Sequence, residues 1–227
     1  MCSSYGIDGF EDVAPRRRSG SRVRFASIED SLATDSSAQD DELVLAWARD
    51  QQGLAKPTGK HARNLNPIIH EGAGARRVDL AWWWLHIDSE PAPYSAFNSR
   101  DDKLLLSWRE PFQRRALIPA NWYAEKGRDF GLPDGELFTL AAIVTPVPLP
   151  HGGRMLSYSM VTREAIGEAA SVHHRMPLVV PQGMQDEWLA PSRIGDASLV
   201  RDALLASDDV SRRLRAFEVE QRGDTLF

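Results

Sequence analysis

Residues 136–162 of the chain, ELFTLAAIVTPVPLPHGGRMLSYSMVT, hold two strand-like segments, at 136–144 and 154–162. Both segments are rich in the apolar, β-branched and aromatic residues typical of strands, and no helical pattern separates them. Similar segments lie at 76–87, 114–119, 175–180 and 214–220. Many strands without a regular alternation of strand and helix predict an α+β fold with a curved, largely antiparallel sheet or open barrel.

Helical patterns are confined to a few peripheral segments, at 40–52, 101–108, 185–190 and 196–207. Residues 8–40 are polar, with clusters of Arg, Ser and Asp, and predict an irregular insertion; residues 53–67 predict a loop. The first six residues are expected to form a short strand or a buried end. Because no internal repeat and no linker after residue 60 is visible, we expect residues 1–227 to form a single domain.

Composition limits the classes of protein to which the chain can belong. It has 227 residues, a net charge of −5 and one cysteine, which excludes an intrachain disulfide framework and indicates a reducing compartment. No segment approaches the roughly 18 consecutive apolar residues of a membrane span, and the N-terminus lacks the apolar core of a signal peptide. We therefore expect a soluble cytoplasmic protein without a large, non-specific nucleic-acid surface.

Common cofactor and metal motifs are absent from the sequence. It contains no GxxxxGK[ST], no GxGxxG after a strand, no HExxH and no CxxC. His173 and His174 are adjacent, so on a strand their side chains would point to opposite faces. The sequence therefore predicts no metal site and no cofactor.

The single cysteine, Cys2, directly follows Met1. If Met1 is trimmed, Cys2 carries a free α-amine beside its thiol, which makes a 1,2-aminothiol. Such a pair condenses with an aldehyde into a five-membered thiazolidine ring, using the amine and then the soft thiol as nucleophiles. Position alone favours an inert terminal cysteine, so the interpretation depends on the rest of the chain.

Four short segments change that interpretation when they are taken together: Cys2 after Met1, AFNSR at 96–100, LIPANWYAE at 117–125 and VHHRMP at 172–177. In this order they resemble the SOS response-associated peptidase (SRAP) family. The usual family forms are Met-Cys-Gly-Arg, Asn-Ala-Arg, Ile-Pro-Ala-Asp-Gly-Phe-Tyr-Glu-Trp and His-Asp-Arg-Met-Pro. The resemblance spans residues 1 to about 190 and implies a single SRAP-like domain.

The resemblance implies an unusual function in the DNA damage (SOS) response. SRAP proteins recognise abasic sites in single-stranded DNA, and their processed N-terminal cysteine forms a thiazolidine with the ring-opened sugar. The resulting DNA–protein crosslink shields the lesion. The family name also records a peptidase activity, in which the same cysteine removes its leading residue. For this chain we therefore expect abasic single-stranded DNA as partner, a monomer, and a place near the nucleoid.

Matched to the family motifs, four residues have implied catalytic roles. Cys2 is the nucleophile, Asn98 holds it in position, Glu125 is a general acid/base for sugar opening, and His173 binds the opened sugar and transfers a proton. Ring opening moves a proton between oxygens, which suits a carboxylate beside a histidine. A free α-amine with a pKa of about 8 is sufficiently deprotonated near neutral pH to attack.

The DNA-binding residues implied by the resemblance are arginines and aromatic residues. Arg100 and Arg175 match residues that contact the DNA backbone, which guanidinium groups bind through charge-assisted hydrogen bonds. The aromatic candidates for stacking on exposed bases include Trp83, Trp84 and Trp122, although tryptophans are more often core residues.

The chain keeps the catalytic residues of the family motifs but differs from the usual forms at positions next to them. Ser3-Ser4 replaces Gly-Arg, His173-His174 replaces His-Asp, and Asn121-Trp122-Tyr123-Ala124-Glu125-Lys126 stands where the family has Asp-Gly-Phe-Tyr-Glu-Trp. The residues of the reaction are kept while expected DNA contacts differ. This pattern predicts retained crosslinking chemistry with weaker or altered DNA binding.

Two other functions remain open from the sequence. One is a cysteine peptidase acting on proteins, with Cys2, His173 and Asn98 as a papain-like trio. The other is a non-catalytic binder of single-stranded DNA, for which Cys2 would be dispensable. Taken singly, each candidate residue also has an ordinary structural explanation, such as a solvated carboxylate for Glu125 or a core histidine for His173.

Overall fold

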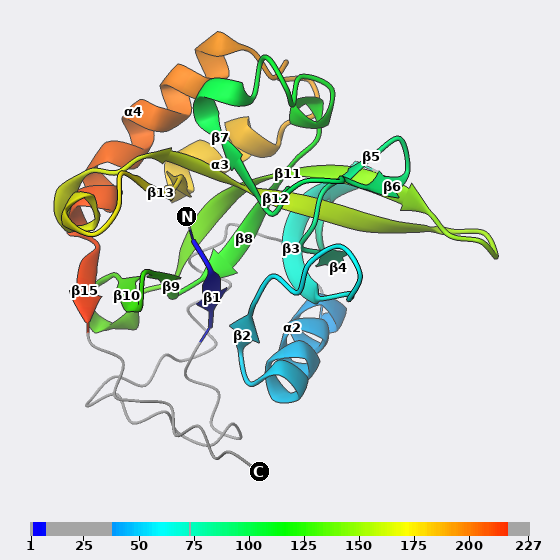
Figure 1. The fold of residues 1–227 in the computed structure, drawn as a ribbon, viewed down its shortest axis with the longest axis horizontal. Coiled ribbons are helices and arrows are strands. Elements are labelled where there is room, and N and C mark those ends of the chain that lie inside the picture. Colours follow the sequence, from blue (N-terminus) through cyan, green and yellow to red (C-terminus); the bar gives the residue numbers. More distant parts are fainter. Residues whose placement is uncertain (1, 8–37, 73, 218–227) are drawn as a thin grey trace.

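The computed structural model describes residues 2–7, 38–72 and 74–217 (Figure 1). The predicted irregular insertion at 8–40 lies outside the described residues except for its last three positions. Those three positions begin helix α2, which covers Ala38–Gln51 and confirms the helix predicted at 40–52.

The centre of the fold is a ring of five paired strands. The ring runs β12-β4-β3-β8-β11 and closes because β11 also pairs with β12. Its strands are β3 (Leu65–Gly72), β4 (Ala75–Trp82), β8 (Arg115–Ala120), β11 (Phe138–Pro148) and β12 (Arg154–Glu164). All pairs in the ring are antiparallel except β12–β4, which is parallel. The predicted largely antiparallel α+β fold is therefore confirmed, with a closed barrel in place of an open one.

Strand β11 shows why the sequence forms this wall. It is buried along most of its length, and alternate residues belong to two different hydrophobic clusters. Leu140, Ala142 and Val144 pack into one cluster, and Ala141 and Ile143 into the other. Because successive side chains on a strand point to opposite faces, a continuous apolar run buries both faces of the wall.

Shorter strands extend the barrel at its edges. β7 (Asn98–Arg100) pairs in parallel with β12, β13 (Arg175–Pro177) pairs with the same strand, and β14 (Val179–Val180) pairs with β11. A separate small hairpin joins β5 (His86–Ile87) to β6 (Glu90–Pro91). β12 therefore carries both β7 and β13, which brings residues near 98 and 175 to the same strand.

A second, five-stranded sheet holds the N-terminal segment. Its order is β15-β10-β9-β1-β2, with β1 (Ser4–Gly6) between β9 (Trp122–Glu125) and β2 (Leu54–Ala55). β10 (Arg128–Gly131) and β15 (Arg215–Phe217) complete it. The strand considered for residues 1–6 is therefore present, and it is an internal strand with a partner on each side.

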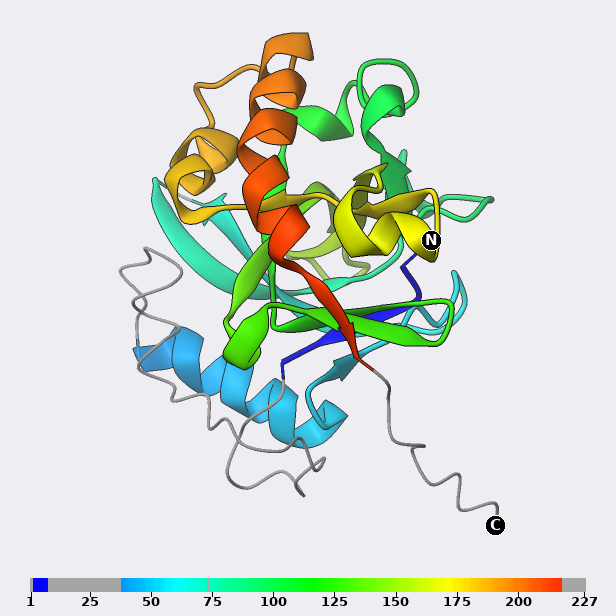
Figure 2. The same ribbon diagram turned by 90° about the vertical axis from the view of Figure 1, so that its left-hand side faces the viewer.

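Within residues 38–72 and 74–217, three α-helices cover the strands from opposite sides. Figures 1 and 2 show α2 on one side and α3 (Gln182–Leu189) with α4 (Ala197–Arg213) on the other. Helix α4 begins where the Asp196 carboxylate accepts a hydrogen bond from the backbone N–H of Leu199 at 2.9 Å, an N-cap. Its buried residues Leu199, Ala203, Ser207 and Ser211 recur every four positions and form the face that packs inward.

Three predicted elements differ in the structure. The strand predicted at 76–87 ends at Trp82, and residues 83–85 turn before the short β5. The helix predicted at 101–108 forms only a short 3-10 helix at Asp101–Lys103 followed by turns. The loop predicted at 53–67 contains β2 and the start of β3, because apolar residues after Asn66 extend that strand into the buried wall.

Candidate active site

Cys2 lies just before the first residue of β1, and backbone pairing of the neighbouring residues with β9 holds it in place. The Ser3 N–H donates to the carbonyl of Ala124 at 3.1 Å, and Ser4 pairs with Ala124 in the antiparallel register. The Cys2 side chain is 1% exposed, and its thiol donates to the Ser4 carbonyl at 3.2 Å. The second residue of the chain is therefore a fixed part of the core, whereas Met1 lies outside the described residues.

Asn98 binds the main chain of Cys2. Its side-chain amide Nδ2 donates to the Cys2 carbonyl oxygen at 2.9 Å, across 96 positions of sequence. Asn98 begins β7, which β12 holds in register through the pair Asn98–Met160. The amide is buried, and its Oδ1 has no hydrogen-bond partner among the described residues. The predicted positioning contact between Asn98 and Cys2 is thus present in the structure.

Glu125 and His173 face one another beside Cys2. Glu125 ends β9 and is 4% exposed, and its Oε2 lies 4.0 Å from Nδ1 of His173. His173 precedes β13, and its Nδ1 accepts a hydrogen bond from the Arg175 backbone N–H at 3.1 Å. The structure therefore brings all four predicted catalytic residues together, from the segment before β1, from β7 and β9, and from the segment before β13.

Burial controls the protonation of the Cys2 thiol. Loss of water around the side chain raises the thiol pKa well above its usual range, and the negative charge of Glu125 raises it further. At neutral pH the thiol is therefore protonated. It can act as a nucleophile only when a neighbouring base accepts its proton.

The two predicted phosphate-binding arginines are both paired with carboxylates of the chain itself. The exposed Arg100 makes a two-pronged contact with Asp102, with distances of 2.9 and 2.7 Å. The buried Arg175 bonds to Asp101 and to the carbonyl of Thr162. Sequence reasoning missed both aspartates, although two acidic residues directly after Arg100 were an available signal.

The three predicted stacking tryptophans are buried. Trp83 and Trp122 have no exposed surface and Trp84 is 8% exposed. The Trp83 indole N–H donates to the Phe97 carbonyl at 2.7 Å, and its ring lies parallel to that of Tyr158. The Trp84 indole N–H donates to the Ala92 carbonyl at 3.0 Å. In this conformation the three rings are part of the core, and none presents a face on which a base could stack.

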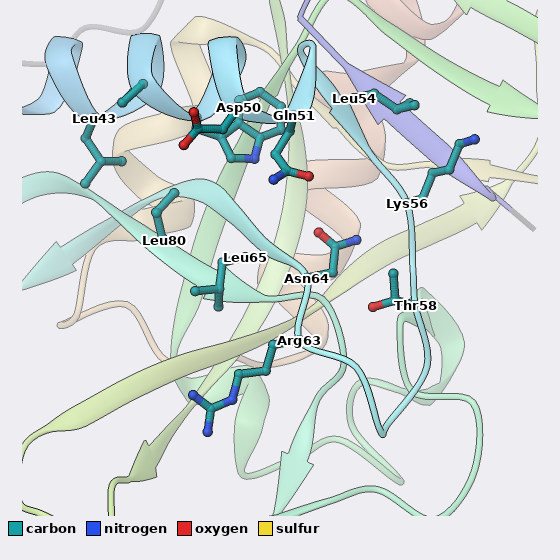
Figure 3. Close-up of a pocket in the computed structure, with 12 residues that line it drawn as sticks. Leu43, Asp50, Gln51, Leu54, Lys56, Thr58, Arg63, Asn64, Leu65 and Leu80 are labelled. Atoms are coloured by element: carbon teal, nitrogen blue, oxygen red, sulfur yellow. The ribbon is translucent and has the colours of Figure 1, made fainter.

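A surface cavity lies away from these residues. It has a volume of about 640 Å³ and lies between the end of α2 and the 54–65 segment. Figure 3 shows residues that line it, which include Asp50, Gln51, Lys56 and Asn64. None of the nine predicted site residues lines it. The cavity is therefore not the candidate active site, which is formed by the buried polar side chains around Cys2.

Within the described part of the chain, no group of three or more His, Cys, Asp or Glu side chains is arranged to hold a metal ion. Over the same residues, no helix is long and apolar enough to cross a membrane.

Comparison with known proteins gives a family match and several relatives. Residues 24–222 match the family described as SOS response associated peptidase (SRAP). The abasic site processing protein YoqW of Bacillus subtilis is 25% identical over 144 residues, which cover 57% of this chain and 64% of that protein. YobE of the same organism, also an abasic site processing protein, is 24% identical over 161 residues, covering 65% of this chain and 73% of YobE. The chain thus spans just under two thirds of YoqW.

Solved structures share the fold at lower identity. A protein from Bordetella bronchiseptica superimposes with a TM-score of 0.64 at 18% identity, covering 97% of this chain and all of that one. A protein from Bacteroides thetaiotaomicron gives a TM-score of 0.61 at 17% identity, covering 95% and 91%. These likenesses show that proteins of Bordetella bronchiseptica and Bacteroides thetaiotaomicron share the fold.

Proposed function

The chain belongs to the SOS response associated peptidase (SRAP) family, and from this premise we propose that it processes abasic sites in single-stranded DNA by joining covalently to them through Cys2. The names of the relatives YoqW and YobE support abasic-site processing. The covalent step, the single-stranded substrate and a monomeric state are our inferences. They rest on the chemistry of the four clustered residues.

The observation that carries the proposal is the hydrogen bond from Asn98 to the Cys2 carbonyl. A cysteine that acts only through its side chain does not require its own main chain to be clamped from a distant strand. A cysteine that also acts through its α-amine does, because the amine and the thiol must both face one carbon atom. Fixing the main chain of Cys2 supports the use of both nucleophiles.

The reaction can be written with its atoms balanced. The α-amine of Cys2, free once Met1 is removed, attacks the aldehyde carbon of the opened sugar, and the carbonyl oxygen leaves as water to give an imine. The thiol sulfur then adds to the imine carbon and its proton passes to the imine nitrogen, which closes the thiazolidine. Glu125 and His173 would move the protons at the sugar oxygens and at the thiol.

The papain-like peptidase alternative has less support. In such a trio the asparagine orients the histidine, and the histidine activates the thiol. Here Asn98 binds the main chain of Cys2 and His173 lies beside Glu125. Burial also raises the thiol pKa, the opposite of the lowered pKa of a preformed thiolate. Release of the chain's own Met1 remains compatible with the proposed site, since Cys2 is adjacent to that bond.

Contacts with DNA would require the arginine pairs to change partner. Arg100 is exposed, so a DNA phosphate can compete with Asp102 for its guanidinium group. Arg175 is buried and its contacts fix the segment that carries His173, which favours a positioning role. This arrangement is consistent with chemistry kept alongside altered DNA binding.

The test is a denaturing gel of the Met1-processed protein with single-stranded DNA that carries one abasic site. We expect a shifted band that survives denaturant and is lost in Cys2→Ala. Intact DNA of the same sequence is the substrate control. Absence of the band, with the N-terminal amine of Cys2 confirmed by mass spectrometry, would refute the covalent function. A non-catalytic binder would instead keep all its DNA-dependent behaviour in Cys2→Ala.

A further inference from the structure

Tyr123 has a buried hydroxyl group for which the described part of the chain offers no hydrogen-bond partner. Its side chain has no exposed surface, and its hydroxyl oxygen makes no hydrogen bond among the described residues. The ring is held by Phe130, which is opposite in the β9–β10 register and stacks on it at 5.2 Å between centroids and 15° between planes. A buried hydroxyl without a partner costs stability, so its presence calls for a reason.

The two other tyrosines buried in the same hydrophobic cluster do have partners. The hydroxyls of Tyr5 and Tyr158 bond to each other. Tyr5 lies directly opposite Tyr123 in the β1–β9 register, so the comparison is between neighbours on paired strands. Among the described residues, the hydroxyls of these two tyrosines are thus satisfied by each other, whereas that of Tyr123 has no partner.

The position of Tyr123 links that hydroxyl to the reaction residues. Tyr123 lies two residues before Glu125 on β9, so both side chains project from the same face of the strand. Burial raises the pKa of Tyr123 well above its usual range, and the negative charge of the nearby Glu125 raises it further. The phenol is therefore protonated at neutral pH and can donate a hydrogen bond.

We propose that the Tyr123 hydroxyl is a further substrate-binding group, which donates a hydrogen bond to the aldehyde oxygen of the opened abasic sugar when the Cys2 amine attacks. As the carbon–nitrogen bond forms, the π electron pair of the carbonyl moves to its oxygen, and a fixed neutral donor stabilises that charge. Tyr123 keeps its own proton, so the balance of the reaction is unchanged. The inference rests on the proposed function.

The residue at position 123 also differs from the usual form of the family motif. Tyr123 stands where the usual form of the motif has Phe, so its hydroxyl is an addition in this chain. Tyr123→Phe therefore removes the hydroxyl alone, keeps the ring that stacks on Phe130, and restores the residue of the usual form. A matched control is Tyr5→Phe, which removes a hydroxyl that already has a partner.

The experiment measures two quantities for the full chain after Met1 removal: the single-turnover rate of crosslink formation with an abasic single strand, and the midpoint of thermal unfolding. We expect Tyr123→Phe to slow crosslinking by about 10–100-fold, which is below the loss typical of an oxyanion-hole donor. Its unfolding midpoint should be unchanged or higher, because no hydrogen bond is lost. Tyr5→Phe should lower the midpoint.

Two results would overturn the inference. One is an unchanged crosslinking rate in Tyr123→Phe while the wild-type protein crosslinks normally. The other is a fall in the unfolding midpoint as large as that of Tyr5→Phe, which would assign the hydroxyl a structural role. Failure of the proposed function is distinct from both, because the wild-type protein itself would then form no crosslink.

Discussion

Replacing Asn98 by Ala tests the contact on which the proposed function depends. The substitution removes the donor to the Cys2 carbonyl, a 2.9 Å hydrogen bond in a buried environment. A buried acceptor left without its donor costs about 1–3 kcal/mol, so we expect the free energy of unfolding to fall by that amount. The main chain of Cys2 also loses the group that fixes its direction. A displacement of about 1 Å at a reacting group costs on the order of 100-fold in rate.

The neighbouring residue provides a matched control. Ser99 follows Asn98 on β7, points to the opposite face, and donates from its Oγ to Oγ of Ser159 at 2.7 Å. Ser99→Ala therefore removes one buried hydrogen bond of similar cost, about 1–3 kcal/mol, from the same strand. It leaves the Cys2 carbonyl and its donor in place. We expect comparable destabilisation with little change in the crosslinking rate.

Urea denaturation gives the free energies of unfolding, and a quenched denaturing gel under single-turnover conditions gives the rates. Mass spectrometry confirms that Met1 has been removed from each variant, so that the amine is present in all. A stable Asn98→Ala protein that crosslinks at the wild-type rate would refute the positioning role. An equal loss of rate in Ser99→Ala would show that the effect follows from weakening β7 in general.

The same geometry leads to four further predictions. Glu125→Gln should slow crosslinking by about 10²–10⁴-fold, the range for a lost general acid/base, while fluorescence anisotropy shows that abasic DNA still binds. Arg175→Ala should lower the free energy of unfolding by about 3 kcal/mol in urea titrations, the lower end for a broken buried pair, because the Asp101 carboxylate that loses its partner is partly exposed. Arg100→Ala should instead leave the fold intact and reduce the salt dependence of DNA binding by about one phosphate contact. The free energy of unfolding should fall as the pH rises above about 8.5, the pKa of a cysteine in an unfolded chain. The reason is that the buried Cys2 keeps its proton in the folded protein while the unfolded chain loses it. In urea titrations, Cys2→Ala should reduce the change in the free energy of unfolding between pH 8 and pH 10.

The barrel could be predicted from the sequence only in part. β8, β11 and β12 were found because each is rich in apolar, β-branched or aromatic residues, and their boundaries differ from the prediction by only a few residues. β3 was missed because Asn66 and Pro67 indicate a turn when they are read locally. In the structure Pro67 pairs with Leu80 near the start of a buried strand, where tertiary packing overrides local preference.

The order of the motifs in the sequence was enough to name the candidate site residues. The contacts between those residues could not be predicted from the sequence. Nothing local indicates that Ser3 pairs with Ala124, which is 121 positions away, yet that pairing places Cys2 beside Glu125. The roles of the arginines and tryptophans depend on similarly distant contacts. Arg175 is bound by Asp101, which lies 74 positions before it in the sequence. The ring of Trp83 stacks on that of Tyr158, which belongs to the barrel strand β12. Residue type predicts what a side chain can do, whereas non-local pairing decides where it lies.

The protonation states at the site determine the order of the two bond-forming steps in the proposed reaction. A free α-amine has a pKa of about 8, so a substantial fraction is unprotonated near neutral pH. The Cys2 thiol is protonated under the same conditions, because burial and the charge of Glu125 both disfavour the thiolate. The amine is therefore the first nucleophile, and the thiol adds only after the imine has formed. In the proposed reaction, Glu125 opposes early ionisation of the thiol by its charge and would then pass the thiol proton to the imine nitrogen as the ring closes, which gives one carboxylate a part in both steps.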